Sequence, residues 1–403
     1  MKCLHCADLH IREKDIEEID KCLQAILITA QHEKPDLAVI AGDVFDNRDV
    51  KVDSKSAILA IGFVSALADI CPVAIVLGTP SHDGSAPKIM QYVRGKYDVI
   101  VATHPVQTRL IDGYFYDREA GDGSEIVEAL ITLIPQPTKQ YFQTLSDVKT
   151  SDQEIGQAMS GLFMGFGAQA SEYKCPHILL YHGGISGAKV STGQILTGQE
   201  IEVSIDQLNM ARADLNLCGH IHMSQQIGDR TFYAGSPYRT NWGEMEPKGF
   251  YVHEVKSYRD KDFMDGDIRE SRFIETPAQR CVRIQRDWTT GEEPLIGDGT
   301  EGAVVRIDLR VWQDEADKID REAIRQDFID NFGAIDVDVR IIRVPRENVR
   351  AEAVLKADTL RDKVQRMAEL RGEEVERSVL TKAEALEAKP ADELLGAVTG
   401  RAA

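Results

Sequence analysis

The stretch Leu37-Ala-Val-Ile-Ala-Gly-Asp-Val-Phe-Asp46 joins an apolar run directly to a polar, glycine-containing loop. Five consecutive apolar residues between polar ones are typical of a strand that is buried on both faces of a sheet. Asp43 and Asp46 then follow at the carboxyl end of that strand. Because sites in open α/β sheets assemble beyond the carboxyl ends of the strands, this stretch indicates a parallel sheet with functional groups along one edge.

The same pattern recurs four more times along the chain, where an apolar run is followed at once by Asp or His. The residues are Asp8 and His10, His82 and Asp83, His182, and His220 and His222. Each motif by itself is short enough to arise by chance as a polar loop. Five of them at successive predicted strand ends, holding five of the ten histidines, indicate a single site.

Helices alternate with strands over the first 110 residues. Strand-like runs cover 3–7, 37–41 and 73–77, and apolar residues recur at helical spacing over 16–32 and 57–67. This order predicts an α/β fold with largely parallel strands and helices on the faces of the sheet. Cys3 and Cys6 have the spacing of zinc ligands, but on a strand they point to opposite faces, so we interpret both as packing residues.

The pattern changes near residue 277. Residues 304–311, 321–332 and 336–344 read as strand, helix and strand, which predicts a small separate α/β unit. Residues 353–389 are strongly helical and are interrupted at Gly372. We therefore predict three regions, with bounds 1–276, 277–346 and 347–403.

Composition limits the possible partners and the cellular location. The 403 residues include 66 acidic and 47 basic side chains, which gives a formal net charge of −19. Such a chain does not bind nucleic acid through a general positive field, so any action on DNA requires bound cations, a local basic patch or a partner. No apolar run is long enough for a membrane span, and the seven scattered cysteines suit a reducing compartment. We expect a cytoplasmic protein with no membrane partner.

The recurring loops carry the ligands of a metal centre. Imidazole and carboxylate groups together suit Mn²⁺, Fe²⁺ or Zn²⁺. Their number exceeds what one ion needs, and two ions that share a carboxylate can hold a phosphate and activate a water molecule. Asp43, in the middle of the set, is the natural shared ligand. A Walker-type phosphate loop is absent from the sequence, so we do not expect this chain to hydrolyse ATP.

The ordered motifs resemble the calcineurin-like metallophosphoesterase superfamily. They are Asp8-x-His10, Gly42-Asp43-x-x-Asp46, His82-Asp83, His182 with Gly187, and Gly219-His220-x-His222. The stretches 1–10, 41–46, 133–139 and 233–240, followed by Lys248-Gly249-Phe250, are similar to the SbcD nuclease family. The resemblance implies a four-layer α/β/β/α sandwich with a small α/β capping domain and a C-terminal helical tail.

The resemblance also implies roles for individual residues. It places Asp8, His10, Asp43 and His222 around one Mn²⁺ ion, and Asp43, His182 and His220 around a second, with Mg²⁺, Fe²⁺ or Zn²⁺ as other possible ions. His82 corresponds to the histidine that protonates the departing 3′-oxygen, and Asp83 is expected to orient it. The chemistry implied is hydrolysis of phosphodiester bonds.

One loop departs from the family pattern. The family places Asn before the histidine as a ligand of the second ion, whereas this loop reads Gly78-Thr-Pro-Ser-His-Asp83 and contains no Asn. Ser81 stands directly before His82 and is our predicted substitute ligand. The hydroxyl of Thr79 or a water molecule remains an alternative.

The resemblance predicts a Mn²⁺-dependent DNA nuclease, with 3′–5′ exonuclease and endonuclease activity, in DNA repair, recombination or replication. Its partners would be DNA, a second copy of the chain, and an SbcC-like coiled-coil ATPase that binds the C-terminal helices. Arg239, Arg340 and Arg343 are the expected DNA contacts, although the last two also fit an ordinary solvated edge. The alternative is that the helices pack on each other as a hairpin.

Two other functions remain open at this point. A stand-alone phosphodiesterase for a small nucleotide or a lipid headgroup would keep the metal centre but would not explain the capping region and the helical tail. A structural subunit would have lost catalysis through the altered loop before His82 and would keep only partner binding.

Overall fold

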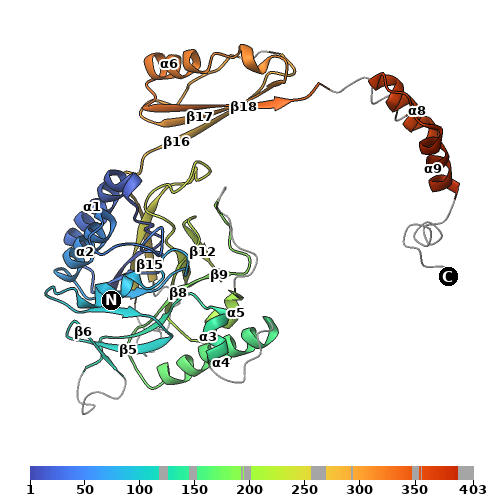
Figure 1. The fold of residues 1–403 in the computed structure, drawn as a ribbon. Coiled ribbons are helices and arrows are strands. Elements are labelled where there is room, and N and C mark those ends of the chain that lie inside the picture. The colour runs from blue at the N-terminus through green and yellow to red at the C-terminus, as the bar shows by residue number, and fades with distance from the viewer. Residues whose placement is uncertain are drawn as a thin grey trace, which may run out of the picture. The chain divides into compact units, whose positions relative to one another are not determined.

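A computed structural model describes residues 1–117, 126–144, 152–191, 194, 201–255, 269–291, 294–346, 354 and 356–388 (Figure 1). The chain divides into two compact units. The first comprises Met1–Val282 with Gly302–Val304, and the second comprises Arg283–Glu301 with Val305–Ala403. Among the described helices, none combines the length and the apolar character that a membrane span requires.

The first unit contains a six-stranded sheet with the order β15-β14-β1-β2-β3-β4. Its strands are Lys2–Cys6 (β1), Leu37–Ile40 (β2), Val73–Val76 (β3), Val99–Ala102 (β4), Gly249–Val255 (β14) and Arg269–Glu275 (β15). Strands β1 to β4 are mutually parallel, and β14 and β15 extend the sheet in antiparallel fashion. The predicted parallel strands are therefore confirmed, and all four carboxyl ends lie at one edge.

A second, seven-stranded sheet has the order β12-β13-β11-β8-β7-β5-β6. Its strands are Val106–Ile111 (β5), Tyr114–Asp117 (β6), Ala129–Ile134 (β7), His177–His182 (β8), Leu215–Gly219 (β11), Gln225–Ile227 (β12) and Thr231–Tyr233 (β13). Strands β7, β8, β11 and β13 are parallel. Two short strands, Gly184–Ile185 (β9) and Glu202–Val203 (β10), pair separately beside it.

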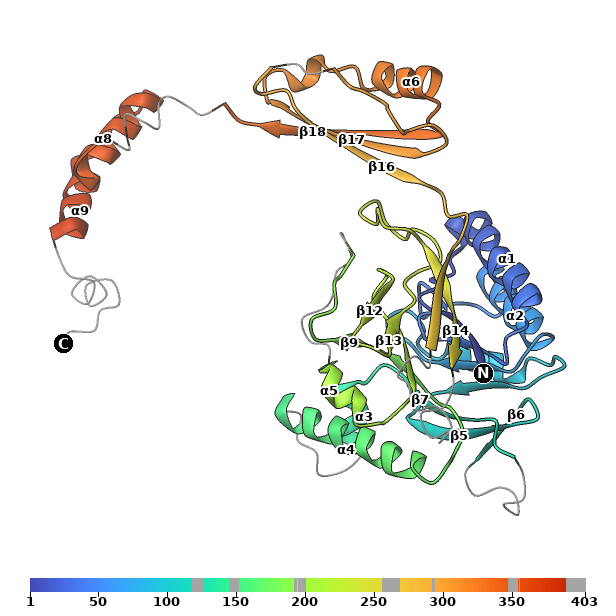
Figure 2. The same ribbon diagram turned by 180° about the vertical axis from the view of Figure 1, so that it is seen from behind.

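Helices cover the outer face of each sheet. They are Ile16–Glu33 (α1), Lys55–Ala68 (α2), Lys139–Thr144 (α3), Asp152–Ala170 (α4) and Ile205–Asn209 (α5), with short 3-10 turns at Glu13–Asp15 and Ala86–Tyr92. Ser54 caps the N-terminus of α2, since its hydroxyl accepts a hydrogen bond from Ala57 N. Figure 1 and Figure 2 show α1 and α2 on one side of the unit and α3, α4 and α5 on the other.

Three apolar clusters define the layers. One fills the space between the two sheets, and its members include Cys3, Val39, Val76, Ile131, Leu180 and Leu217. A second lies between the first sheet and helices α1 and α2, and a third between the second sheet and α4 and α5. The predicted four-layer α/β/β/α arrangement is confirmed for this unit. Cys3 packs between the sheets and Cys6 packs under the helices, as strand alternation predicts.

The second unit contains a three-stranded sheet with the order β16-β17-β18. Its elements are Cys281–Asp287 (β16, which begins in the first unit), Val304–Trp312 (β17), a 3-10 turn at Ala316–Lys318, Arg321–Phe332 (α6) and Asp336–Val344 (β18). Asp320 caps α6, and Gly333 ends it with a φ of 68°. The predicted strand, helix and strand are thus present, while the capping role and the predicted region bounds remain predictions.

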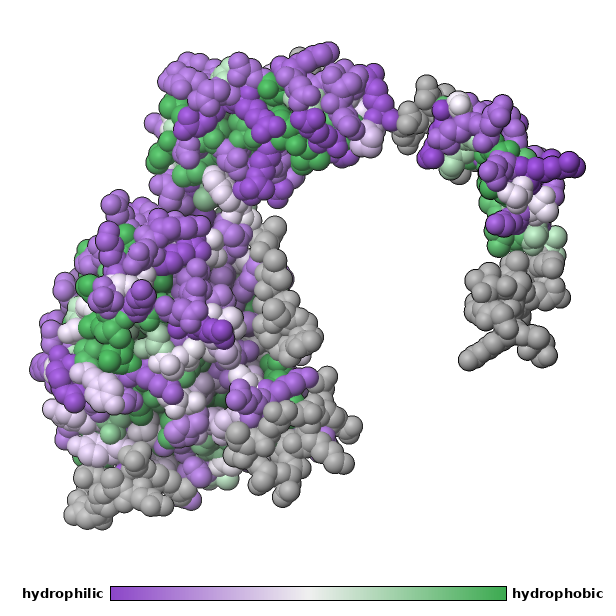
Figure 3. Space-filling model, in the orientation of Figure 1, coloured by the Kyte–Doolittle hydropathy of each residue, from purple (hydrophilic) through white to green (hydrophobic). Residues whose placement is uncertain are grey.

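Two further helices form an antiparallel hairpin in the second unit. They are Leu360–Arg371 (α8) and Arg377–Ala388 (α9), and Gly372 ends α8 with a φ of 69°. An ion pair of 2.6 Å joins Arg361 to Glu384 across the hairpin. Apolar side chains on both helices stay partly exposed, namely Leu360, Met367, Val379 and Leu386. Figure 3 shows apolar residues among hydrophilic ones on this hairpin.

Gly219 lets the two sheets approach each other closely. A Cβ atom at this position would overlap the carbonyl oxygen of Ala41, at the carboxyl end of β2. We expect Gly219→Ala to destabilise the protein by about 1–3 kcal/mol, because the added methyl group forces the sheets apart. Gly62→Ala is the matched control, since a Cβ on that helical glycine meets open space and is expected to stabilise α2 by about 0.5–1 kcal/mol. Urea unfolding measures both, and equal stability of the two variants would contradict the close approach.

Candidate metal centre

The carboxyl ends of both sheets supply one cluster of polar side chains. From the first sheet come Asp8 and His10 after β1, Asp43 after β2 and Thr79 after β3, and from the second come His182 at the end of β8 and His220 and His222 after β11. The predicted ligands therefore converge although they come from opposite layers. Except for Thr79, all of these side chains are buried.

The backbone at these strand ends is held in unusual conformations. Asp8, His10 and Asp43 have positive φ angles of 51°, 39° and 49°, and His220 has one of 105°. Residues other than glycine rarely adopt this left-handed region, and such strained positions cluster at functional sites. Backbone hydrogen bonds from Asp8 N to Gly42 O (3.1 Å) and from His10 N to Asp43 O (3.0 Å) tie neighbouring loops together. The sharp turns therefore bring the side chains back over the sheet edge.

Asp43 is shared by two potential ligand groups. One group is Asp8, His10 and Asp43, and the other is Asp43, His182 and His220, and within each group the ligand atoms lie within 4.8 Å of one another. A third set, His10, Asp46 and His82, meets the same distance limit and shares His10 with the first group. Asp43 Oδ2 is 3.3 Å from His182 Nε2 and 3.8 Å from His10 Nε2. The carboxylate that the sequence indicated as shared is therefore the one that both groups contain.

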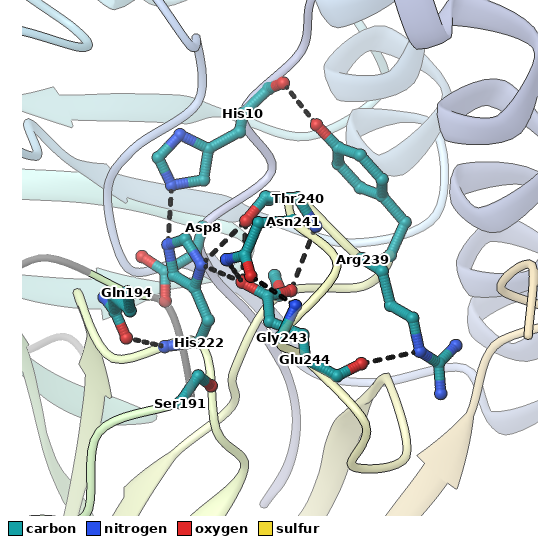
Figure 4. Close-up of polar contacts among 12 residues, drawn as sticks. Asp8, His10, Ser191, Gln194, His222, Arg239, Thr240, Asn241, Gly243 and Glu244 are labelled. Carbon is teal, nitrogen blue, oxygen red and sulfur yellow. Dashed lines mark hydrogen bonds and ion pairs between the residues drawn. The ribbon is translucent and has the colours of Figure 1, made fainter. Parts of the chain in front are cut away.

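Hydrogen bonds fix how two of the imidazoles face the cluster. His182 Nδ1 lies 2.6 Å from the carbonyl oxygen of Ala41, so Nδ1 donates to this oxygen and Nε2 is the ring nitrogen that faces Asp43. His222 Nδ1 lies 2.7 Å from Glu244 Oε1, and its Nε2 faces His10 Nε2 at 3.0 Å (Figure 4). Both rings thus present Nε2 to the cluster, the arrangement that a metal-binding histidine requires.

The charge distribution fits a divalent cation. Asp8 is fully buried, and its Oδ2 atom accepts no hydrogen bond from any residue that the structure describes. Burial raises the pKa of Asp8 and lowers the pKa of His10 well below its ordinary value. An unpaired buried carboxylate oxygen beside imidazole nitrogens is a costly arrangement that a bound cation would stabilise.

Asp43 and His182 stabilise each other's charged forms. Burial raises the pKa of Asp43, but the neighbouring imidazoles, first among them His182, outweigh burial and hold it well below the ordinary value. For His182, burial lowers the pKa, but Asp43 and Asp8 raise it to about 9. The carboxylates therefore create a negative field at this point, which attracts positive charge.

His82 lies at the side of the cluster. Its ring meets the His10 ring edge-on, with 4.7 Å between centroids, and its Nδ1 lies 3.0 Å from the backbone carbonyl oxygen of Asp46. We expected Asp83 to orient His82. The two carboxylate oxygens of Asp83 instead accept hydrogen bonds from Phe45 N (3.0 Å) and Gly78 N (2.7 Å). The carbonyl of Asp46 therefore orients His82, while Asp83 connects the loops after β2 and β3.

Burial also affects the Asp83 carboxyl group. Its removal from water raises the pKa to about 7, and the nearby charge of Asp43 adds to this rise. The two backbone N–H donors oppose the rise. Asp83 thus holds together the loops that follow β2 and β3. No local sequence pattern distinguishes this role from that of orienting the adjacent His82.

Thr79, rather than Ser81, reaches the cluster. Ser81 is exposed, and its carbonyl oxygen accepts a hydrogen bond from Arg48 N on the outside of the loop. Thr79 N donates to Asp43 Oδ1 (2.6 Å), and Thr79 Oγ1 lies 3.1 Å from Asp43 Oδ2 and 3.4 Å from His182 Nε2. The tentative placement of Ser81 beside the second ion is therefore corrected. Gly78 permits this turn, because a Cβ there would overlap Asp43.

Glu244, which lies behind His222, was not predicted from the sequence. Its side chain is fully buried and accepts hydrogen bonds from His222, Thr240 and Asn241 (Figure 4). It also pairs with Lys248 at 2.8 Å. Burial raises its pKa, but the bond from His222 and the charge of Lys248 outweigh burial and hold it well below the ordinary value. The only signal in the sequence was Lys248, a cation directly before a buried strand.

The arginines that we predicted to contact DNA all have protein partners. Arg239 donates to the backbone carbonyl oxygens of Glu244, Glu246 and Gln279 at 2.8, 3.0 and 3.0 Å, so it holds a loop of the first unit. In the second unit, Arg340 pairs with Asp338 at 3.0 Å and Arg343 pairs with Asp317 at 2.6 Å. Each of these two arginines is about half exposed, which fits the solvated-edge interpretation.

Comparisons with known proteins place these residues in context. No curated protein sequence matches the chain. The similar solved structures include the GAP50 anchor in the inner membrane complex of Plasmodium (12% identity, TM-score 0.41, 69% of this chain and 85% of that chain). They also include a dimetal phosphatase from Danio rerio (9%, 0.36, 63% and 92%) and TT1561 of Thermus thermophilus (11%, 0.30, 62% and 92%). The sequence profile described as calcineurin-like phosphoesterase matches residues 1–224, which include both ligand groups and His82.

Proposed function

The chain belongs to the calcineurin-like phosphoesterase family, and from this premise we propose that it is a DNA nuclease that hydrolyses phosphodiester bonds at a centre for two Mn²⁺ ions. The observation that carries the proposal is the position of Asp43, which belongs to both ligand groups. Two ions held by these groups would activate a water molecule for attack near neutral pH and would stabilise negative charge on the phosphate.

The residues of the chain divide this work between them. Asp8, His10, Asp43 and His222 would hold one ion, and Asp43, His182 and His220 would hold the other. His82 would protonate the departing oxygen. Because His82 Nδ1 donates to the carbonyl of Asp46, the proton that this ring can deliver is the one on Nε2.

DNA as the substrate, and an ATPase as partner, are supported by features outside the metal centre. The motifs over residues 1–250 are similar to the SbcD family, and a separate α/β unit follows them. The α8–α9 hairpin leaves apolar side chains partly exposed, which suits docking onto an SbcC-like coiled coil. With a net charge of −19, the protein would rely on the ions and a partner for positive surface at the DNA. We also propose that the chain forms a homodimer.

Digestion of end-labelled linear duplex and single-stranded DNA tests the nuclease proposal. Wild-type protein with Mn²⁺ is expected to shorten the labelled strand, and protein treated with a chelator is expected to leave it intact. The same preparation is assayed with a cyclic dinucleotide and with glycerophosphodiesters. Mn²⁺-dependent hydrolysis of these small substrates without DNA cleavage, both alone and with the ATPase added, would contradict the proposal and favour a small-substrate phosphodiesterase.

Thr79→Val is expected to weaken binding of one Mn²⁺ ion about tenfold. The substitution keeps the hydrogen bond from the backbone N–H to Asp43 but removes the hydroxyl that lies beside Asp43 Oδ2 and His182 Nε2. A hydrogen bond to a charged group contributes about 1.5 kcal/mol or more to binding free energy, which corresponds to about tenfold in affinity. Calorimetric titration with Mn²⁺ measures the effect. Ser81→Ala is the matched control and is expected to bind as wild type does. The reverse order of affinities would restore Ser81 as the ligand.

A further inference from the structure

Glu244 occupies a position directly behind the imidazole of His222. Its Oε1 atom accepts hydrogen bonds from His222 Nδ1 (2.7 Å), Thr240 Oγ1 (2.7 Å) and Asn241 Nδ2 (2.9 Å). Its Oε2 atom accepts from Thr240 N (2.9 Å) and pairs with Lys248 Nζ (2.8 Å). Both oxygens are therefore fully used, and the side chain has one defined position (Figure 4).

Lys248 is the buried cation that pairs with this carboxylate. Its ammonium group is fully buried and contacts Glu244, Glu246 Oε1 (2.9 Å), Ser236 Oγ (3.0 Å) and the carbonyl oxygen of His222 (3.1 Å). A buried carboxylate without a compensating cation would lose its charge or destabilise the fold. The same ammonium group also holds the backbone of His222, so the ring and its carboxylate partner share one support.

We propose that Glu244 is a positioning residue for the metal centre, which fixes His222 in the Nδ1–H tautomer with Nε2 directed at the ion, and that Lys248 holds the Glu244 carboxylate in this position. The proposal rests on the proposed function in one respect, namely that His222 is a metal ligand. A carboxylate behind a metal-binding imidazole increases the basicity of the ring and restricts its rotation. Glu244 itself does not face the two ligand groups, so its effect on the ion must pass through His222.

A purely structural role for Glu244 would have different consequences. The carboxylate also accepts hydrogen bonds from Thr240 and Asn241, so it stabilises the loop in which Arg239 donates to the carbonyl oxygen of Glu244. If that were its only role, its replacement would lower stability and would change metal affinity equally whether or not His222 is present. If it acts through His222, its replacement would have no further effect once His222 is removed.

Glu244→Gln and Glu246→Gln form a matched pair for this test. Both remove one carboxylate charge from Lys248, but only Glu244 contacts His222. Calorimetric titration with Mn²⁺ is expected to show one site weakened about 10- to 100-fold in Glu244→Gln, and both sites within about threefold of wild type in Glu246→Gln. Adding Glu244→Gln to His222→Ala is expected to leave the remaining affinity unchanged. Equal Mn²⁺ binding by wild type and Glu244→Gln, or a loss of affinity that persists without His222, would overturn the proposal.

A spectroscopic measurement on the wild type covers the case in which Glu244→Gln does not fold. The ¹⁵N resonances of the His222 ring in metal-free protein at pH 8, assigned by comparison with His222→Asn, report which nitrogen carries the proton. The Nδ1–H tautomer is expected, and the Nε2–H tautomer would overturn the proposal. Neither readout uses DNA, so a wild type that binds Mn²⁺ but does not cleave DNA would contradict the proposed nuclease function and leave the role of Glu244 standing.

Discussion

Replacing Asp43 with Asn is expected to abolish Mn²⁺-dependent phosphodiester hydrolysis, with a loss of about 1,000-fold or more. Asp43 is the one residue that both ligand groups contain, and it faces His10 and His182 at 3.8 and 3.3 Å. An amide at this position carries no charge and bridges two cations poorly. Metal centres of this kind stabilise the transition state by several kcal/mol, and each 1.4 kcal/mol or so corresponds to tenfold in rate.

The same substitution is expected to lower the stability of the metal-free protein near neutral pH. Burial raises the pKa of Asp43, but the surrounding imidazoles, first among them His182, outweigh burial and hold it well below its ordinary value, so the charged form of Asp43 stabilises the folded state. Asn keeps the shape of the side chain and an oxygen for Thr79 N, but it removes this attraction. Thermal unfolding in chelator, Mn²⁺ titration and the DNA assay together check this prediction. Retention of two tightly bound ions by Asp43→Asn would contradict the assignment of Asp43 as the shared ligand.

His82→Ala is expected to lower the rate of DNA cleavage about 100- to 10,000-fold while leaving Mn²⁺ binding unchanged. A positioned acid contributes this much when the leaving group is a poor one, as the 3′-oxygen of a nucleotide is. The Nδ1 atom of His82 is already bonded to the carbonyl of Asp46, so the ring is fixed beside His10 and able to deliver a proton from Nε2. Single-turnover cleavage of an end-labelled duplex measures the effect.

The choice of substrate distinguishes an acid from a metal ligand. A bis-p-nitrophenyl phosphodiester has a leaving group that needs no proton, so His82→Ala is expected to hydrolyse it at nearly the wild-type rate. His32→Ala is a suitable control because His32 is an exposed histidine on α1. Equal losses on both substrates, together with a lower metal content, would show that His82 is a ligand and not an acid.

The fold was largely predictable because the sequence patterns that identify its strands and helices are local. The apolar run that ends at Asp43 identifies a doubly buried strand, and the same signal marks the strands that lead to His182 and His220. Helical periodicity in α1 and α2 then supplies the outer layer of the first sheet. Strand alternation was enough to place Cys3 and Cys6 on opposite faces. Each of these inferences depends on neighbouring residues only, and each agrees with the structure.

The loop after β3 shows where local information was insufficient. Ser81 and Thr79 both offer a hydroxyl, and proximity in sequence to His82 favoured Ser81. The turn at Gly78 and the hydrogen bond from Thr79 N to Asp43 decide otherwise, since they direct Thr79 inward and leave Ser81 exposed. Backbone conformation at a tight turn depends on what lies across the loop, and no spacing rule describes it.

The sequence by itself determined the layered fold and most of the candidate ligand residues, because strand burial and the chemistry of Asp and His are properties of short segments. Tertiary structure alone decided which atoms meet: the carbonyl of Asp46 behind His82, the hydroxyl of Thr79 beside Asp43, and the carboxylate of Glu244 behind His222. The physical reason is that a hydrogen bond is directional and depends on distances below about 3.5 Å. Such distances between loops from two different sheets are fixed only when the sheets pack together.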